Sequence, residues 1–289
     1  MRRPHLNSNQ DAFFKSWAKP GPIPAVIPPV IGENETLDAI SGYFRIYQLK
    51  DGHRFSTDDL LVAWFGTMGC PSASRVLDLG SGIGSVGMVA AWRLLGAQFT
   101  TIEAQEVSVA LARKSARFNG LDSRYEIRQG DFRADGILKD DERFDLILGS
   151  PPYFPSGTGI EAEHPQKAAC RFELRGDVRD YCAVASLHLA MGGVFACVFP
   201  MNPAEQQSRV YEGARDAGLT VIRQRPVVLR EGEPPLLGLF LMVKSEHLPE
   251  KFRRIGDPLW LEPALIIRCK DGSIHPEYSA VKLSIGFPP

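Results

Sequence analysis

Arg75-Val-Leu-Asp-Leu-Gly-Ser-Gly-Ile-Gly84 is the stretch of sequence around which the rest of the chain is organised. Apolar residues lead into Asp78, three glycines then interrupt the pattern between Gly80 and Gly84, and an apolar run from Val86 to Leu95 follows. This order predicts a strand, a tight turn and the start of a helix. Glycine suits such a turn because it reaches backbone angles closed to other residues and lets a ligand approach the main chain. The helix start adds free amide groups and a partial positive charge.

Two acidic residues distinguish between the ligands that such a glycine turn can bind. Asp78 stands inside the turn, where it would repel a pyrophosphate but attract the cationic methionine part of S-adenosylmethionine (SAM). The next strand, Phe99 to Ile102, ends in Glu103, roughly twenty residues past the glycines, where a carboxylate can bind both hydroxyls of a ribose. NAD shares the second feature but not the first. The residues therefore favour SAM over NAD, and over a turn without a ligand.

Length and charge limit what the chain can be. With 289 residues and 44% hydrophobic content, it is large enough for one α/β domain with a proper core, and we expect one domain with extensions. The net charge of −1 provides no general attraction to a polyanion. If nucleic acid is the partner, the binding surface has to be local.

Cysteine and histidine spacing gives no sign of a metal site. The five cysteines show no C-x-x-C pairing, and the six histidines are scattered, so we expect no metal. Cys182 and Cys197 lie in apolar runs and are expected in the core, while the odd number of cysteines favours a reducing compartment. No apolar run reaches membrane-spanning length and the first residues lack a signal-peptide core, so we expect a cytoplasmic protein without a membrane partner.

Two segments precede the glycine turn. Residues 1–40 are rich in proline, which predicts an extended arm or linker. Further on, Ser56 or Thr57 can cap a helix that has Asp58 and Asp59 in its first turn. This helix either simply covers the sheet or closes its N-terminal end over the cofactor, and the sequence leaves both readings open.

The chain after Glu103 continues the alternation of helices and strands. An amphipathic helix is expected from Ala104 to Asn119, and a third strand from Tyr125 to Gln129 ends in Gly130-Asp131-Phe132. Asp131 would lie at the rim where ligands bind, within reach of an adenine amino group, although it can also simply cap the turn.

The strand Phe144 to Gly149 is followed by Ser150-Pro-Pro-Tyr153. Two prolines fix the backbone, leave carbonyls without amide partners and hold an aromatic ring at the sheet edge. A flat, amino-bearing base could stack on Tyr153 or Phe154 while the Pro151 carbonyl and the Ser150 hydroxyl accept its amino hydrogens. Such acceptors can direct the lone pair of a conjugated, poorly nucleophilic amine towards a methyl sulfonium.

The second half of the chain completes the predicted α/β order. Pro155 to Cys170 is expected to be a mobile flap. If the following helix begins early enough, the four-residue spacing of Arg171, Arg175 and Arg179 would place them on one helical face, either solvated or in contact with phosphate. The remaining predicted elements are a helix from Asp177 to Ala190, a strand from Val194 to Phe199, a helix from Pro203 to Gly218, and a strand hairpin formed by Leu219–Leu229 and Leu236–Lys244.

Taken in this order, the motifs resemble those of class I SAM-dependent methyltransferases that modify exocyclic amines, and within them the bacterial tRNA adenine N6-methyltransferases that act beside the anticodon. Further similar segments are Gly52-x-Arg54-Phe-Ser-x-Asp58, Arg171-x-Glu173 and Asp271-Gly-Ser-Ile-His-Pro-Glu-Tyr278. The resemblance implies a Rossmann-like, seven-stranded, mostly parallel sheet with the last strand antiparallel and helices on both faces. It also implies SAM at the carboxyl ends of the strands and a flipped adenine at Pro-Pro-Tyr.

The resemblance assigns roles to residues one by one. Ser150 departs from the pattern, because the family has Asn there, or Asp in relatives, and Ser-Pro-Pro-Tyr occurs among enzymes that methylate cytosine N4. The residues predicted to act on the target amine are Ser150, Pro151, Pro152 and Tyr153. The residues predicted to bind the cofactor are Asp58, Asp78, Gly80, Ser81, Gly82, Gly84, Glu103, Asp131, Phe132 and Ser150.

The function predicted from the sequence is SAM-dependent methylation of adenine N6 in a structured RNA such as tRNA. Cytosine N4, a protein glutamine N5, and a non-catalytic RNA-binding module with a SAM fold remain alternatives. The predicted organisation is a Pro-rich extension at residues 1–40, a methyltransferase domain at 41–245, and an appendage at 246–289 packed on that domain.

Overall fold

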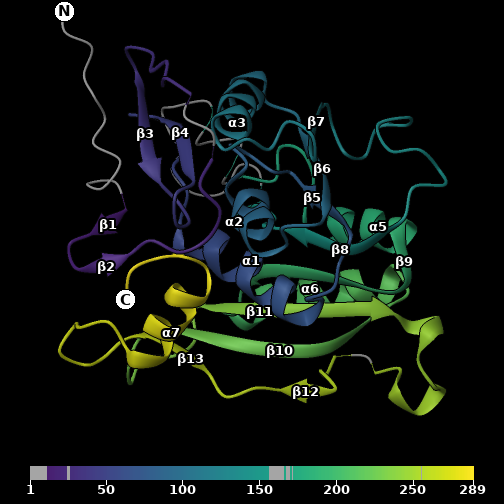
Figure 1. Ribbon diagram of the computed structural model, residues 1–289. Coiled ribbons are helices and arrows are strands. Elements are labelled where there is room, and N and C mark those ends of the chain that lie inside the picture. The colour runs from purple at the N-terminus through teal and green to yellow at the C-terminus, as the bar shows by residue number, and fades with distance from the viewer. Residues whose placement is uncertain (1–11, 25–26, 156–165, 167–169, 171, 255) are drawn as a thin grey trace, which may run out of the picture.

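The computed structural model describes residues 12–24, 27–155, 166, 170, 172–254 and 256–289, and one nine-stranded sheet runs through this described part (Figure 1). Its strands are β5 (Arg75–Leu79), β6 (Gln98–Glu103), β7 (Tyr125–Gln129), β8 (Phe144–Gly149), β9 (Leu189–Pro200), β10 (Leu219–Arg230), β11 (Leu237–Lys244), β12 (Trp260–Leu261) and β13 (Leu265–Arg268).

The strand order confirms the predicted fold class. The strands lie in the order β7-β6-β5-β8-β9-β11-β10, and all pairs from β7 to β9 are parallel. β11 is antiparallel to both of its neighbours, as predicted for the last strand. The sheet has nine strands instead of seven, because the short β12 and β13 add to the edge of β10. The chain runs outward from β5 in both directions, which opens a crevice at the carboxyl ends of β5 and β8.

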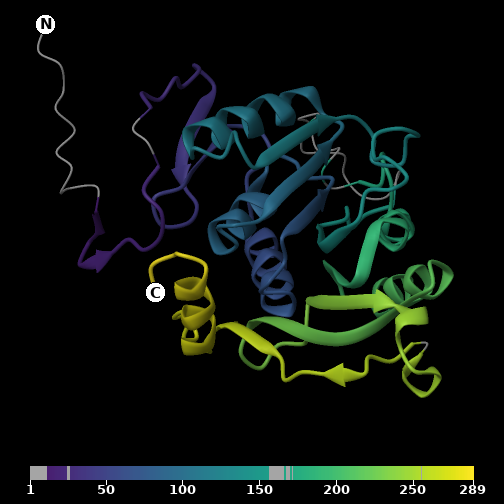
Figure 2. The ribbon, with the colours of Figure 1, turned by 45° about the vertical axis from the view of Figure 1, so that its right-hand side comes forward.

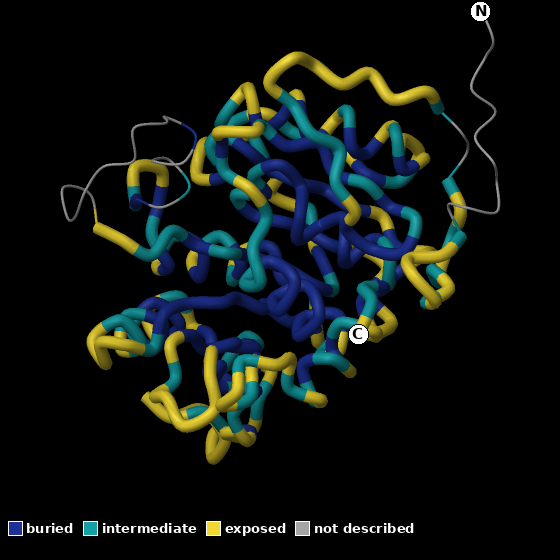
Figure 3. Tube along the Cα trace, turned by 90° about the vertical axis from the view of Figure 1, so that its left-hand side faces the viewer, coloured by how far each residue is buried: buried dark blue, intermediate teal, exposed yellow. Residues whose placement is uncertain are grey.

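Helices cover both faces of the sheet. The helices of the first face are α1 (Thr57–Gly69), α2 (Ser85–Arg93) and α3 (Glu106–Phe118), and those of the opposite face are α5 (Val178–His188) and α6 (Ala204–Asp216). Strand side chains alternate between these faces: Val76 packs in the cluster under α1 to α3, and its neighbour Leu77 packs in the cluster with α5 and α6. Figure 3 shows the buried residues through the middle of the fold. Cys182 and Cys197 are both fully buried, as expected.

The N-terminal segment includes paired strands that the sequence did not predict. The short β1 (Phe13–Phe14) pairs with β2 (Trp17–Ala18), and β3 (Glu35–Ala39) pairs with β4 (Arg45–Leu49). Asn119, at the end of α3, accepts a hydrogen bond from Arg45 N and donates one to Arg45 O, both at 2.8 Å. The division expected at residue 40 therefore runs through a hairpin that is fixed to α3.

The C-terminal segment returns to the N-terminal one. After the short 3₁₀ helices Ser245–His247 and Glu250–Phe252 and the strands β12 and β13, the chain ends with α7 (Pro276–Ser284), which packs on β13. Gly42 N donates a hydrogen bond of 2.7 Å to Gly286 O. Figures 1 and 2 both show α7 and the chain end beside the N-terminal strands.

The segment after Tyr153 follows the predictions from the sequence only in part. The condition for a common helical face of the arginines, an early helix start, is not met at Arg175, because α5 begins only at Val178, where the Asp177 side chain accepts hydrogen bonds from the N–H groups of residues 179 and 180. The predicted flap lies outside the described residues except for Pro155, Gln166 and Cys170. None of the described helices is long and apolar enough to cross a membrane.

Candidate active site

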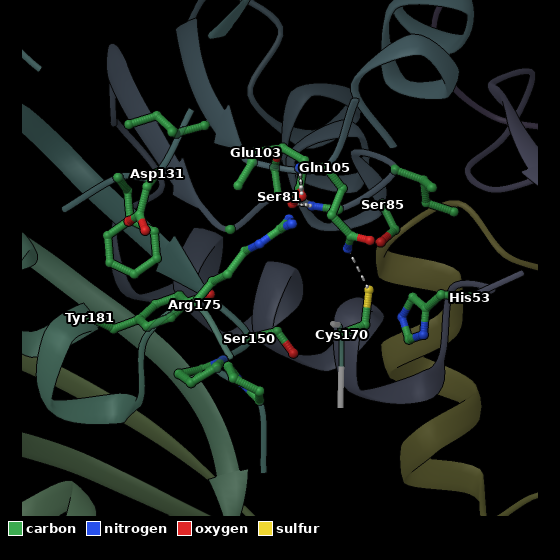
Figure 4. Close-up of a pocket in the computed structure, with 18 of the residues that line it drawn as sticks. His53, Ser81, Ser85, Glu103, Gln105, Asp131, Ser150, Cys170, Arg175 and Tyr181 are labelled. Carbon is green, nitrogen blue, oxygen red and sulfur yellow. Dashed lines mark hydrogen bonds between the residues drawn. The ribbon is translucent and has the colours of Figure 1, made fainter. Parts of the chain in front are cut away.

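A cavity of about 470 Å³ opens at the carboxyl ends of the parallel strands (Figure 4). The turn after β5, the end of β6, the turn after β7 and the segment after β8 all contribute to its wall. Of the predicted site residues, those that line this cavity are Asp58, Gly80, Ser81, Gly82, Glu103, Asp131, Phe132, Ser150, Pro151, Pro152 and Tyr153.

Two positions of the glycine turn disfavour a side chain, one for lack of space and both because of their backbone conformation. Gly80 has φ +60°, and a Cβ there would lie 2.1 Å from the Tyr181 hydroxyl oxygen. Gly82 has φ +55° and would meet nothing within 4 Å, so its main chain faces open space. A ligand in the cavity can therefore approach the main chain directly.

Glu103 lies at the end of β6 with only 6% of its surface exposed. Its two carboxylate oxygens accept hydrogen bonds from Gly82 N at 2.8 Å and from Gln105 N at 2.6 Å. Burial raises the pKa of this carboxyl, and the N–H donors oppose the rise. Since each carboxylate oxygen has a second lone pair, Glu103 can still accept hydrogen bonds from ribose hydroxyls while it fixes the glycine turn.

Asp78 is not among the residues that line the cavity, and its contact with the cofactor ammonium stays a prediction. It is 1% exposed and accepts a hydrogen bond of 2.9 Å from Gly87 N behind the turn. Burial, with Asp59 and Glu103 nearby, raises its pKa well above the usual value. Gly84 is also outside the cavity, as the left-handed N-cap of α2.

Tyr153 is anchored from two sides. Its hydroxyl donates a hydrogen bond of 2.7 Å to Asp58 Oδ2, and its ring meets Phe199 edge to face with centroids 5.8 Å apart. Burial and the Asp58 charge raise the pKa of Tyr153 well above the usual value. Asp58, predicted as a cofactor ligand, thus connects the start of α1 to the Pro-Pro-Tyr segment. Helix α1 covers the sheet, and Asp58 in its first turn also lines the cavity.

Asp131 and Phe132 follow β7. Asp131 Oδ1 accepts hydrogen bonds from Arg133 N at 2.9 Å and Arg133 Nε at 3.0 Å, and the pair holds the pKa of Asp131 below its usual value. Asp131 therefore organises its own turn and lines the cavity at the same time. Phe132 is buried edge to face against Tyr181 at 4.7 Å.

Several cavity residues were not predicted from the sequence, of which Arg175 is the most informative. Figure 4 shows its side chain reaching across the cavity towards Glu103. Its charge opposes the rise that burial causes in the Glu103 pKa and adds to the effect of Arg133 in lowering the Asp131 pKa. The arginine spacing had drawn attention to this position, but for the wrong geometry. The other cavity residues not predicted are His53, Ser56, Ile83, Ser85, Ile102, Ala104, Gln105, Gly130, Cys170 and Tyr181, whereas Phe154, which also lines the cavity, was expected as an alternative stacking ring.

A search for metal-binding groups found none: in the described part of the chain, no three His, Cys, Asp or Glu residues are placed to hold an ion.

Comparison with known proteins agrees with this geometry. Residues 56–169 match the family described as Methyltransferase small domain. The chain is 26% identical over 211 residues to a protein of Bacteroides fragilis named tRNA1(Val) (adenine(37)-N6)-methyltransferase, covering 72% of this chain and 85% of that protein. A protein of the same name from Shewanella amazonensis is 29% identical over 207 residues, covering 70% and 84%.

The fold has a counterpart among solved structures. A protein from Agrobacterium tumefaciens described as a predicted O-methyltransferase superposes with a TM-score of 0.57 at 17% identity, over 80% of this chain and 98% of that one. This likeness concerns the fold alone. The match to the methyltransferase small domain over residues 56–169 and the curated relatives support a SAM-dependent methyltransferase.

Proposed function

We propose that this chain transfers a methyl group from SAM to N6 of adenine in tRNA. The observation that carries the proposal is that Ser150 to Tyr153 line the same cavity as the glycine turn and Glu103. An amine held by the first group would face a cofactor held by the second. The curated relatives, which are named as tRNA adenine N6-methyltransferases, support tRNA adenine as the target. We place this reaction in the cytoplasm.

The residues of the cavity have separate tasks in this proposal. SAM supplies an electrophilic methyl group on a sulfonium. Glu103 accepts the ribose hydroxyls, and the bare backbone at Gly82 admits the cofactor to the turn. The Pro151 carbonyl and the Ser150 hydroxyl accept hydrogens of the target amine and turn its lone pair towards the methyl group. Rate acceleration then comes mainly from orientation and proximity.

Labelled SAM tests the proposal directly. The protein is incubated with labelled SAM and with total RNA, DNA or protein from cells that lack its gene, and the products are hydrolysed and identified. We expect N6-methyladenosine in the tRNA fraction. If the label appears in N4-methylcytosine or in a protein glutamine, the target is that group and not adenine. Binding of SAM without transfer to any fraction would make the protein a non-catalytic module.

A further inference from the structure

A second cavity, of about 560 Å³, lies beside the candidate active site. It is formed between the end of β10, β13, α7 and the first residue of α1, and we call it the basic groove. Thr57 lines the basic groove, whereas the next residue, Asp58, lines the cofactor cavity and holds Tyr153. Thr57 also forms a hydrogen bond with the side chain of Tyr278, which opposes the rise that burial causes in the Tyr278 pKa. The groove therefore begins one residue from the anchor of the predicted base platform.

Three cations line the basic groove: Arg230, Arg268 and Lys282. Glu233 is its one acidic lining residue, and no ion pair links it to any of the three cations. Arg268 Nη1 donates a hydrogen bond of 2.8 Å to the main-chain oxygen of Gly272, which carries no net charge. The described lining of the groove, with three cations and one carboxylate, therefore keeps a net positive charge.

The other two arginines of β10 differ from Arg230 because they form ion pairs. Arg223 and Arg225, earlier in β10, both form ion pairs with Glu262, and Arg225 also pairs with Glu277. Towards the active-site end, the pairing stops. Unpaired charge is thus confined to the part of β10 that lines the groove.

Keeping these charges together is unfavourable in the free protein. Arg230 and Arg268 are register partners on the neighbouring strands β10 and β13, and like charges placed opposite each other destabilise a sheet. Burial and the Arg268 charge lower the pKa of Lys282. A bound anion would offset this repulsion. No contact in the described fold explains why the three cations lie together.

We propose that the basic groove binds the phosphate backbone of the RNA substrate next to the target nucleotide. This inference rests on the proposed function. The overall charge of −1 gives no general attraction to RNA, so phosphate contacts have to come from a local group of cations. The position beside Thr57 and Asp58 lets neighbouring phosphates bind in the groove while the target base enters the cavity at Tyr153. Backbone contacts of this kind position the nucleic acid without reading its sequence.

The test neutralises the groove and follows RNA and cofactor separately. Arg230→Gln, Lys282→Gln and the double variant are compared with wild type for tRNA affinity at several salt concentrations, for the KM and kcat of methyl transfer to tRNA, and for SAM affinity by calorimetry. We expect each substitution to reduce the slope of log affinity against log salt by about 1. The double variant should bind tRNA at least about tenfold more weakly and show a raised KM, with kcat at saturating tRNA and SAM affinity unchanged.

Arg215→Gln is the matched control, because Arg215 is an exposed arginine on α6, on the opposite face of the sheet, and should leave the salt slope unchanged. Groove variants with wild-type tRNA affinity and salt slope, in a protein that methylates tRNA, would overturn the inference and leave the proposed function intact. Equal losses of SAM and tRNA affinity would overturn it too, as they would indicate a structural role. If wild type neither binds nor methylates tRNA, the proposed function and the inference both fail.

Discussion

Ser150 is the residue whose chemistry bears most directly on the target base. Its hydroxyl can accept a hydrogen from an amine, but it is shorter than Asn and is itself a donor. If the target is adenine, Ser150→Asn should preserve or raise the rate of methyl transfer, and Ser150→Ala should lower it by no more than about tenfold, or about 1.4 kcal/mol. Single-turnover rates on the native RNA measure both. An Ala variant that is faster than the Asn variant would contradict the adenine assignment.

Glu103 has two tasks that a single substitution separates only partly. Glu103→Ala removes the carboxylate predicted to bind the ribose, worth roughly 1.5–3 kcal/mol of SAM affinity. It also removes the acceptor for Gly82 N and Gln105 N, so the free energy of unfolding should fall as well. Calorimetry measures the affinity and denaturant unfolding the stability. Unchanged SAM affinity in a folded variant would exclude Glu103 as the ribose ligand.

Tyr153 is predicted to stack on the target base. Tyr153→Ala should weaken RNA binding by about 1–3 kcal/mol and reduce turnover while sparing SAM affinity. Its exposed neighbour provides the comparison, since Phe154→Ala changes the other aromatic ring that a base could use. If Phe154→Ala has the larger effect on RNA, the platform is Phe154. If Tyr153→Ala reduces SAM affinity equally, its contact with Asp58 is structural.

The site residues differ in how far the sequence could predict them. The positions of Gly80, Gly82 and Glu103 follow from a short motif and one strand end, both of which are local. The contact between Asp58 and Tyr153 joins residues 95 positions apart, so no spacing rule points to it. Asp78 shows a different limit, because its place in the motif is clear, whereas its hydrogen bond to Gly87 N, nine residues on, was not predicted.

The N-terminus of α1 contains a carboxyl whose ionisation should affect stability. Asp59 is buried, and burial raises its pKa to about 6, although Ser56 N and Ser85 Oγ donate to its Oδ2. Because the folded state favours the protonated carboxyl, Asp59 contributes most to the free energy of unfolding below about pH 4. This contribution is lost as the pH rises to about 6.

Asp59→Asn keeps an oxygen that can accept both hydrogen bonds but removes the titration. Its free energy of unfolding, relative to wild type, should therefore increase between about pH 4 and 6, by at most about 1.4 kcal/mol per pH unit, and level off above. Denaturant unfolding of the cofactor-free proteins across this range measures it. A difference that does not vary with pH would show that Asp59 is not buried as an unpaired carboxyl.

At the level of elements, long periodic segments were predictable and short ones were not. The amphipathic α3 and the hairpin of β10 and β11 occur where the pattern placed them. β12 and β13 have two and four residues, too few to show a period, and they become strands only because β10 offers an open edge. α5 begins at Val178, one residue after its predicted start, because Asp177 is its N-cap.

For the whole molecule, the two terminal segments share one packing site on α2. Gly21, Gly42 and Gly286 all lie so close to the Trp92 ring that an added Cβ would approach it to within 3.0 Å. We propose on this basis that residues 246–289 unfold together with the methyltransferase domain and do not form a separate unit.

Gly286→Ala tests this proposal. Gly286 has φ +77°, and the new methyl group would lie 2.8 Å from Trp92 Cζ2 and 2.9 Å from Gly42 N. Gly218→Ala is the matched control, since Gly218 has φ +69° but nothing within 4 Å. Both variants incur the left-handed backbone strain of about 1–2 kcal/mol, and Gly286→Ala should lose roughly 1–3 kcal/mol more through steric overlap. Global unfolding in denaturant should remain one transition with this additional loss. A separate early transition, or equal losses in the two variants, would mean that the C-terminal segment unfolds independently of the domain.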